Sequence, residues 1–308
     1  MARRMTKWET DVRRGMGVGV GLAIFIVVVD VVSVVLLITR PLSFGTFILS
    51  LALFLSIGLL VLIAYWLYGL FLSRYLLDRN ELTIQWGAVQ QVIPMGQVEA
   101  VFTGEEVEGP IHFSGGRWPG HCVGFGEVPV PGGEPTPALF YATVSPQWHI
   151  YIVTPGLVYG ISPAQRDDFL ESLLKRMEMG PTQVVEQSTI RPKFLSWSIW
   201  RDRLALGLLG AGILAAVALL GLLTFRYPGL PLLIPLHFDA AGTPDRFGPR
   251  VQVFITPLIG LLTLLLNGTL GGFAYRRERT ISYLLWGGAV LVQILVWTAA
   301  VGLLGHIA

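Results

Sequence analysis

One polar segment, residues 234–250, carries the side chains of this chain that are best suited to chemistry. It places a His, two Asp, two Arg, two Gly and three Pro in 17 residues, between two long apolar runs. His237 could change charge at mildly acidic pH. Together with Asp239 and Asp245 it offers metal-ligating side chains, although the segment lacks the closed ligand set that usually marks a metal site.

The same residues also favour a rigid turn, so a structural cap and a binding site are both open interpretations. Gly242 permits a positive φ, and Pro244 with Asp245 suits the turn that follows. Arg246 could pair with Asp239 or with Asp245. A cap that packs on the neighbouring helices is the simpler interpretation. The residues that would bind a ligand or partner are His237, Asp239, Gly242, Pro244, Asp245 and Arg246.

Membrane helices must position this segment, because the chain has the composition of a membrane protein. Charged residues make up 14% of its 308 residues, against about 25% in an average soluble domain. A single cysteine, Cys122, excludes an intramolecular disulfide and a cysteine-only zinc site. Five apolar runs are long enough to cross a bilayer as helices, near residues 16–39, 44–72, 204–225, 251–275 and 282–305.

Lys and Arg beside the apolar runs predict which side of the membrane each loop occupies. Five basic residues precede the first run, and residues 276–279 read Arg-Arg-Glu-Arg. A cytoplasmic location for both puts residues 74–203 inside, and residues 226–250 and the C-terminus outside. This orientation leaves three basic residues in a loop outside the membrane, contrary to the rule. They are Arg226, Arg246 and Arg250.

Residues 74–180 change to short alternating runs, which predict an aqueous domain of β-strands. The predicted strands are Glu81–Trp86, Ala88–Ile93, Gln97–Phe102, Leu139–Val144, His149–Val153 and Leu157–Ile161. A helix should then start at Ser162-Pro163 and bury one face. That face consists of Phe169, Leu170, Leu173, Leu174 and Met177.

Several separated motifs in this domain resemble the bacterial PH-like family. They are the stretch from Arg74 to Gly87, Val92-Ile-Pro-Met, the Gly-rich stretch from Arg117 to Gly126, and Tyr159-Gly-Ile-Ser-Pro. The resemblance covers about residues 72–178 and implies a bacterial source and a small β-barrel. The expected fold is therefore an α-helical integral membrane protein with five transmembrane helices and an inserted α+β PH-like β-barrel, capped by one C-terminal helix.

The charge of this domain argues against lipid headgroups as its partner. Residues 74–180 contain six Lys plus Arg and twelve Asp plus Glu, so the domain has a net charge of −6. Each basic residue near an anionic membrane contributes only about 1 kcal/mol, and an acidic domain should be repelled. A phosphoinositide-type lipid is therefore disfavoured, nucleic acid is not expected, and a cytoplasmic protein partner fits better.

Residues 104–137 within the domain are rich in Gly and Pro and predict a mobile surface loop, with ligand or partner contact as the alternative. The stretch contains several side chains that ligate metals, but their spacing matches no compact zinc pattern. These side chains are Glu105, Glu106, Glu108, His112, His121 and Cys122.

Three polar residues lie inside the predicted spans. Asp30 is in the first span, where an ionisable group is costly if charged and unpaired. A proton, ion or substrate relay and a protonated or locally hydrogen-bonded residue are both open interpretations. Asn267 and Gln293 suit hydrogen bonds between helices.

The motif from Pro235 to Gly248 resembles a second bacterial family, the membrane domain of unknown function 1648 that occurs in SdpI-like proteins. Its signature joins Pro-x-His-aromatic-Asn/Asp to a Gly-x-Pro-Asp turn and an aromatic residue, and the resemblance covers about residues 204–275. Asp239 stands where the family more often has Asn. The resemblance implies signalling, or immunity against a secreted toxin.

Four regions follow from these patterns: a transmembrane hairpin (1–73), the PH-like domain (74–180), an interfacial linker (181–203) and a three-helix membrane domain (204–308). We expect a non-catalytic sensing, immunity or interaction protein of the bacterial plasma membrane, with a peptide or protein ligand outside and no cofactor. A transporter or membrane enzyme that uses Asp30, His237, Asp239 and Asp245 is one alternative. An assembly subunit of a larger membrane complex is the other.

Overall fold

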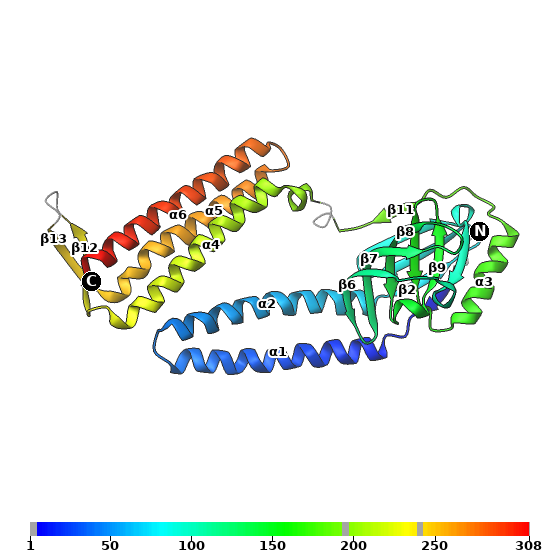
Figure 1. Cartoon of the computed structure of the whole chain (residues 1–308), viewed down its shortest axis with the longest axis horizontal. Helices are drawn as coiled ribbons and strands as arrows, with labels where there is room; N and C mark the ends of the chain where they lie inside the picture. Colours follow the sequence, from blue (N-terminus) through cyan, green and yellow to red (C-terminus); the bar gives the residue numbers. More distant parts are fainter. Residues whose placement is uncertain (1–4, 193–196, 239–242, 308) are drawn as a thin grey trace. The chain divides into compact units, whose positions relative to one another are not determined.

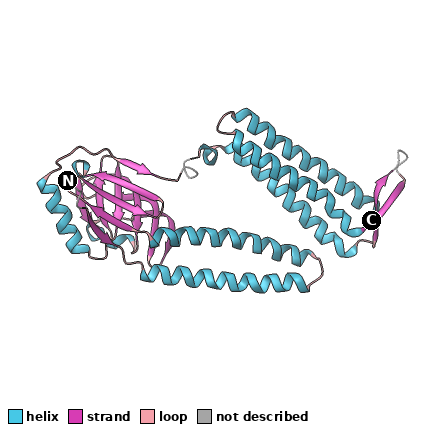
Figure 2. Cartoon of the chain, turned by 180° about the vertical axis from the view of Figure 1, so that it is seen from behind, coloured by secondary structure: helices cyan, strands magenta, loops and turns pink. Residues whose placement is uncertain are grey.

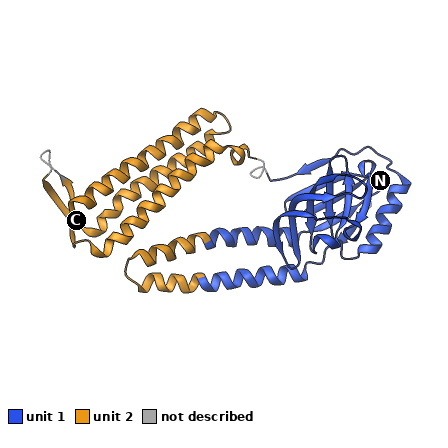
Figure 3. Ribbon diagram, in the orientation of Figure 1, with its two compact units in different colours: residues 1–29, 56–196 blue, residues 30–55, 197–308 orange. Residues whose placement is uncertain are grey.

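The computed structural model of the chain describes residues 5–192, 197–238 and 243–307. The chain forms two compact units, residues 1–29 with 56–196 and residues 30–55 with 197–308 (Figure 3). Among the described residues, five helices are long and apolar enough to cross a membrane, as the sequence predicts. They are α1 (Arg13–Thr39), α2 (Phe44–Phe71), α4 (Arg203–Arg226), α5 (Ile255–Ala274) and α6 (Arg279–Ile307).

The first unit contains two β-sheets and one covering helix, α3 (Arg166–Met179) (Figures 1 and 2). One sheet has the order β1 (Thr6–Glu9), β2 (Arg74–Leu77), β3 (Glu81–Trp86), β4 (Val89–Pro94) and β11 (Ser188–Ile190). The other has the order β5 (Ala100–Thr103), β9 (Ile150–Thr154), β10 (Leu157–Ile161), β8 (Pro135–Ala142), β7 (His121–Pro129) and β6 (His112–Trp118). Neighbouring strands are antiparallel except for β8 and β10, which run parallel.

Alternating apolar residues build the core of this unit. Leu82 and Ile84 of β3 expose at most 1% of their surface, and they pack with residues of β2, β9 and β10 in one cluster. Tyr75 is fully buried in the same cluster, where its hydroxyl donates to the Tyr141 carbonyl at 2.6 Å. The resulting β-rich body with a covering helix confirms the predicted PH-like architecture.

Two details of the predicted helix are wrong. It starts at Arg166 rather than at Ser162, because Ser162 is buried among the strands and its hydroxyl accepts the Thr143 backbone N–H at 2.7 Å. Leu173 is fully buried, as the helical spacing predicts, but Leu174 is 43% exposed. The buried face of α3 is therefore narrower than the predicted one.

The predicted loop at residues 104–137 is also wrong, because most of this stretch is strand. β6, β7 and the start of β8 lie within it, and β7 pairs with both neighbours along its length. Gly115 faces Gly124 across the β6–β7 pair, and Phe113 faces Gly126. The glycines that suggest a mobile loop occupy positions where two strands approach closely or an aromatic ring covers the backbone.

Both outer strands of the five-stranded sheet come from segments beyond the predicted domain. Thr6–Glu9 pairs with β2 before α1 begins, and Ser188–Ile190 pairs with β4 after α3 ends. Trp8 of β1 packs edge-on against Phe169 at a centroid distance of 5.4 Å. The N-terminal segment is therefore part of the β-rich body as well as the lead into a membrane helix.

The second unit contains the α4–α6 bundle and a two-stranded hairpin, β12 (Leu233–Phe238) and β13 (Pro244–Pro249) (Figure 1). Small residues allow close packing within the bundle. A Cβ on Gly271 would overlap the Trp286 indole, with Cε2 of that ring at 2.7 Å, and one on Gly212 would lie 2.8 Å from a Leu264 methyl. Close packing of this kind holds α4, α5 and α6 together as a bundle.

Candidate functional site

The polar segment of the sequence is the β12–β13 hairpin. His237 faces Arg246 across the two strands, and the register shifts on both sides of His237. Irregular pairing of this kind turns a side chain out of the regular pleat. Asp239 and Gly242 lie outside the described residues, in the connection between the strands.

His237 and Asp245 are the predicted site residues that the hairpin brings into contact. His237 Nδ1 lies 2.7 Å from Asp245 Oδ1, and the two side chains are 65% and 48% exposed. Within the described residues, the partner of Asp245 is thus His237 and not Arg246. So exposed a pair contributes little to stability, and its outer atoms are accessible to a ligand.

The metal interpretation of this segment gains no support from the residues that are described. No group of three His, Cys, Asp or Glu side chains comes together among them in a way that would hold a metal ion. His237 and Asp245 make a pair, and the third suggested ligand, Asp239, lies outside the description.

The base of the hairpin is anchored on the helices. Ile234 is fully buried in a cluster with residues of α4 and α6. The Arg250 backbone N–H donates to the Leu232 carbonyl at 3.0 Å, and its guanidinium lies 4.7 Å from the centre of the Tyr227 ring. The site is therefore held on a rigid support.

The hairpin also exposes large apolar side chains beside polar ones. Leu233 is 62% exposed and Phe247 is 59% exposed, and Pro244 and Arg246 are also exposed. Exposed aromatic and apolar groups next to a hydrogen-bonding pair are typical of surfaces that contact another molecule.

The three polar residues of the spans have different surroundings. Gln293 is buried in α6, and its Nε2 atom donates to the Gly260 carbonyl of α5 at 2.8 Å, a hydrogen bond between helices. Asn267 is half-buried and makes no hydrogen bond with a described residue through its side chain. Asp30 is half-buried in α1 and has an interaction partner.

A polar cluster at the other end of the α4–α6 bundle was not predicted. Asp202 precedes α4 and accepts hydrogen bonds from the Leu204 and Ala205 backbone N–H groups, both at 3.0 Å. It also accepts from the Tyr275 hydroxyl at 2.6 Å and from the Tyr283 hydroxyl. The Tyr275 hydrogen bond first, and then that of Tyr283, lower the pKa of Asp202 to about 2.

Asp202 therefore joins the starts or ends of all three helices through one carboxylate. The sequence does contain a signal for its helix-capping role, because an Asp directly before a long apolar run is a typical N-cap. The two tyrosines are more than 70 residues away in sequence, so their contribution depends on the folded bundle.

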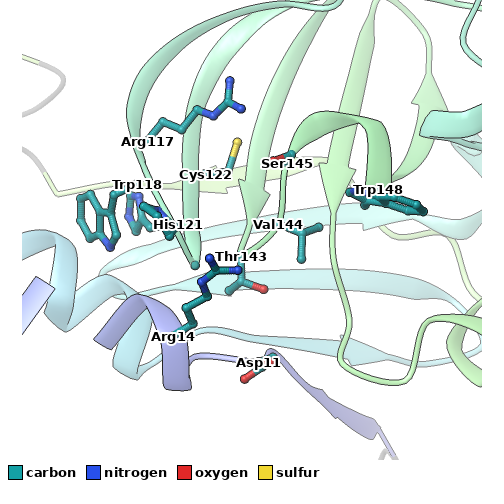
Figure 4. A pocket seen from close by; sticks show the side chains of 12 residues that line it. Asp11, Arg14, Arg117, Trp118, His121, Cys122, Thr143, Val144, Ser145 and Trp148 are labelled. Atoms are coloured by element: carbon teal, nitrogen blue, oxygen red, sulfur yellow. The ribbon is translucent and has the colours of Figure 1, made fainter. Parts of the chain in front are cut away.

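The first unit contains a cavity of about 640 Å³ between the start of α1 and the β6–β8 strands (Figure 4). Figure 4 shows the Arg14 side chain extending from α1 towards Thr143, with Arg117 and Cys122 on the strand side. Burial raises the pKa of the Cys122 thiol to about 11, partly offset by the Arg117 charge. The thiol is thus protonated at physiological pH.

His121 forms one wall of this cavity. Its ring stacks on Trp118 at a centroid distance of 4.0 Å and an interplanar angle of 9°. Burial lowers the pKa of His121 to about 4, so the imidazole is neutral at physiological pH. Its Nδ1 atom lies 3.0 Å from the Gly116 carbonyl and must donate the proton, which leaves Nε2 as an acceptor.

The wall of the cavity is fixed to the membrane helix. The Trp118 indole N–H donates to the Gly15 carbonyl at 3.1 Å. Gly15 and Gly120 approach so closely that a Cβ on Gly15 would lie 2.8 Å from the Gly120 carbonyl carbon. Because 105 positions separate these glycines, the sequence offers no direct signal for the cavity.

Two regions of the chain match known families. Residues 73–177 match the family described as Bacterial PH domain, over β2 to α3. The chain contains a bacterial PH domain. Residues 213–261 match the Domain of unknown function (DUF1648), which includes the β12–β13 hairpin. Both resemblances in the sequence are thereby confirmed, and β1, β11 and the α1 residues of the cavity lie outside the matched PH domain.

One relative adds a limited comparison. An uncharacterized protein of Archaeoglobus fulgidus is 47% identical over 47 residues, which are 15% of this chain and 26% of the relative. The chain thus spans about a quarter of the length of that relative. No solved structure matches the chain.

Proposed function

We propose that this protein is a non-catalytic recognition protein of the bacterial plasma membrane. In this proposal the β12–β13 hairpin faces the outside and binds a peptide or protein, and the PH domain contacts a protein partner in the cytoplasm. The basic residues before α1 and between α5 and α6 support this orientation.

The observation that carries the proposal is the combination of an anchored base and an exposed recognition surface on one hairpin. Ile234 fixes the base in the helix bundle, while the His237–Asp245 pair and the Phe247 ring are open to solvent. Binding surfaces are often built in this way, from exposed groups on a connection that a rigid scaffold positions. An exposed aromatic ring also suits the centre of a protein interface.

The exposed pair also favours recognition over catalysis. Catalytic acids and bases usually lie in clefts where burial and neighbouring charges perturb their pKa values. Here both members of the pair are about half-exposed or more.

Site-specific photo-crosslinking in living cells tests this function. A photoreactive phenylalanine analogue at Phe247 should form a product with a polypeptide, and Asp245→Ala should abolish that product at equal expression. The matched control is Arg226→Gln, an exposed charge at the end of α4 that should leave the product unchanged. Crosslinks to lipid alone, or a product that survives Asp245→Ala, would contradict recognition at the hairpin.

A further inference from the structure

We propose that the outer edge of β4 binds an extended polypeptide segment of a cytoplasmic protein, with a Ser or Thr side chain opposite Gln91. Residues 181–190 of the chain itself, called the strap below, occupy this edge through β11, the last strand before the chain leaves the first unit (Figure 1). The partner replaces β11 by adding its own strand to the same edge. This inference rests on the proposed contact of the PH domain with a cytoplasmic protein, and it names the site and the chemistry of that contact.

A buried glutamine gives this edge a preference for a hydroxyl side chain. Gln91 of β4 is 1% exposed, and Thr189 lies opposite it in the β4–β11 register. The Thr189 hydroxyl donates to the Gln91 side-chain oxygen at 2.5 Å, while the Gln91 amide donates to the Tyr141 hydroxyl at 3.0 Å. The Gln91 oxygen therefore needs a donor at the edge. An apolar side chain in the place of Thr189 would leave this buried oxygen unpaired, which is costly.

The strap itself is held at the edge by polar contacts more than by burial. All three residues of β11 are exposed, Ile190 by 56%, and Val184 earlier in the strap is 100% exposed. Besides the Thr189 hydrogen bond, the Gln187 amide donates to the Tyr159 hydroxyl at 2.9 Å. A strand that buries so little apolar surface gains little from the hydrophobic effect. Its release therefore costs less than the release of a strand that carries core residues.

The packing between the strap and the domain is also incomplete. A cavity of about 300 Å³ is lined by residues 181–185 and by the end of β4. Gln97 lines it as well, and its side-chain oxygen is buried without a hydrogen-bond partner among the described residues. The start of the strap is fixed, because the Asn80 side-chain oxygen accepts the Thr182 and Gln183 backbone N–H groups at 2.7 and 3.1 Å. The remainder of the strap can therefore separate from β4 while its start stays in place.

The edge needs a new occupant once β11 has left. The backbone groups of β4 that pair with β11, together with the Gln91 oxygen, would lose their partners. Such an edge is a template for another strand, and strand addition takes its affinity from main-chain hydrogen bonds and its specificity from side-chain positions. β11 lies outside the matched PH domain, residues 73–177. The domain strands thus remain complete without β11.

The length of the strap favours a separate protein over a second copy of the chain. Five residue steps lead from the fixed Gln183 to Ser188, the first residue of β11. They span at most about 18 Å when fully extended. So short a connection restricts the exchange of β11 between two copies, whereas a segment of another protein has no such tether.

Binding of a synthetic peptide to the purified full-length protein in detergent tests the proposal. The probe is a fluorescent peptide with the sequence of residues 186–191, Glu-Gln-Ser-Thr-Ile-Arg, and fluorescence anisotropy measures its affinity. The native strap should compete with the peptide. The double variant Gln187→Ala, Thr189→Ala lacks both side-chain hydrogen bonds of the strap and should bind the peptide about tenfold more tightly or more. Both substituted residues are exposed, so the fold should be retained, and circular dichroism checks it.

Val184→Ala is the matched control, because this side chain belongs to the same strap and is 100% exposed. It should change the affinity by less than about twofold. A second peptide, with Val at the position of Thr189, should bind the double variant about fivefold more weakly, since it lacks the hydroxyl donor. Equal affinity of the native chain and the double variant would overturn the proposal, and so would equal binding of the two peptides.

Two further measurements separate this inference from its alternatives. A stable dimer of the native chain in light scattering, dissociated by Thr189→Ala, would overturn the assignment to a separate protein and give the edge to a second copy. Failure of peptide binding would leave the proposed role of the β12–β13 hairpin untouched, because the hairpin lies in the other unit and is tested by crosslinking at Phe247. Failure of that crosslinking would count against the proposed function without changing the peptide result.

Discussion

Gly15→Ala should destabilise the junction between α1 and the PH domain. A Cβ at Gly15 would lie 2.7 Å from a Leu70 methyl and 2.8 Å from the Gly120 carbonyl carbon. Leu70 is fully buried, and Gly120 has a φ of +89° in the β6–β7 turn. Neither neighbour can move without a change in the backbone or the core.

The size of the effect follows from these contacts. Overpacking a well-packed site costs about 1–3 kcal/mol. The shift also weakens the hydrogen bond from the Trp118 indole to the Gly15 carbonyl, which contributes about 1 kcal/mol. Gly17 is two residues further along α1 and lies on a different face of the helix. It has no atom within 4 Å of an added Cβ. Gly17→Ala should therefore be neutral, or stabilising by up to about 1 kcal/mol through helix propensity.

Thermal unfolding of both variants in the same detergent measures the difference. Gly15→Ala should lower the Tm of the PH domain by several degrees relative to the native chain, and Gly17→Ala should not. Far-ultraviolet circular dichroism would follow the β-rich body, and native-like spectra at low temperature would confirm that both variants fold. Equal Tm values for the two variants would refute the close approach of α1 and the β6–β7 turn.

Three further predictions concern stability. Leu173→Ala should cost about 2–5 kcal/mol, while Leu174→Ala should stay within about 0.5 kcal/mol, as chemical denaturation would show. The pKa of Asp202 in the folded protein is about 2 against an ordinary 3.8. The stability that its carboxylate gives the folded protein is therefore lost as pH falls from about 3.8 through 2, and Asp202→Asn should flatten the acid end of a plot of Tm against pH. Burial holds the pKa values of His121 and His149 at about 4 against 6.5, so the PH domain should lose stability as pH falls from about 6.5 through 4. His149→Gln should reduce that slope, and an unchanged slope would contradict the buried neutral imidazole.

Local patterns predicted much of the fold. The five spans stand out because each needs about 20 apolar residues in succession. The strands Glu81–Trp86 and Leu157–Ile161 begin and end where alternation and flanking turns predict them. These features depend on residues that are neighbours in the sequence, so the sequence alone is enough to predict them.

Features that depend on distant partners were missed. β1 pairs with residues that are 65 to 71 positions away in the sequence, for example Trp8 with Tyr75. β6 and β7 contain so many glycines that their sequence resembles a loop, and the facing pair of Gly115 and Gly124 explains why strands form there. The cavity requires a contact between Gly15 and Gly120, which no local pattern encodes.

The candidate hairpin site was predicted in part. The sequence singled out His237 and Asp245, but it suggested Arg246 as the partner of the carboxylate. Spacing alone cannot decide such a pairing, because the register shifts at His237 determine which side chains meet. Asp239 and Gly242, the remaining members of the motif, lie outside the described residues.

The most direct test of the central claim is to determine which side of the membrane each site faces in intact cells. Single cysteines at Phe247 and Glu134, both exposed positions, would be treated with a membrane-impermeant maleimide. Native Cys122 should give little background, because it is 2% exposed and burial raises its pKa to about 11. The proposed function predicts labelling at position 247 in intact cells, and at position 134 only after permeabilisation. Labelling of position 134 in intact cells, with position 247 protected, would contradict an outward-facing hairpin.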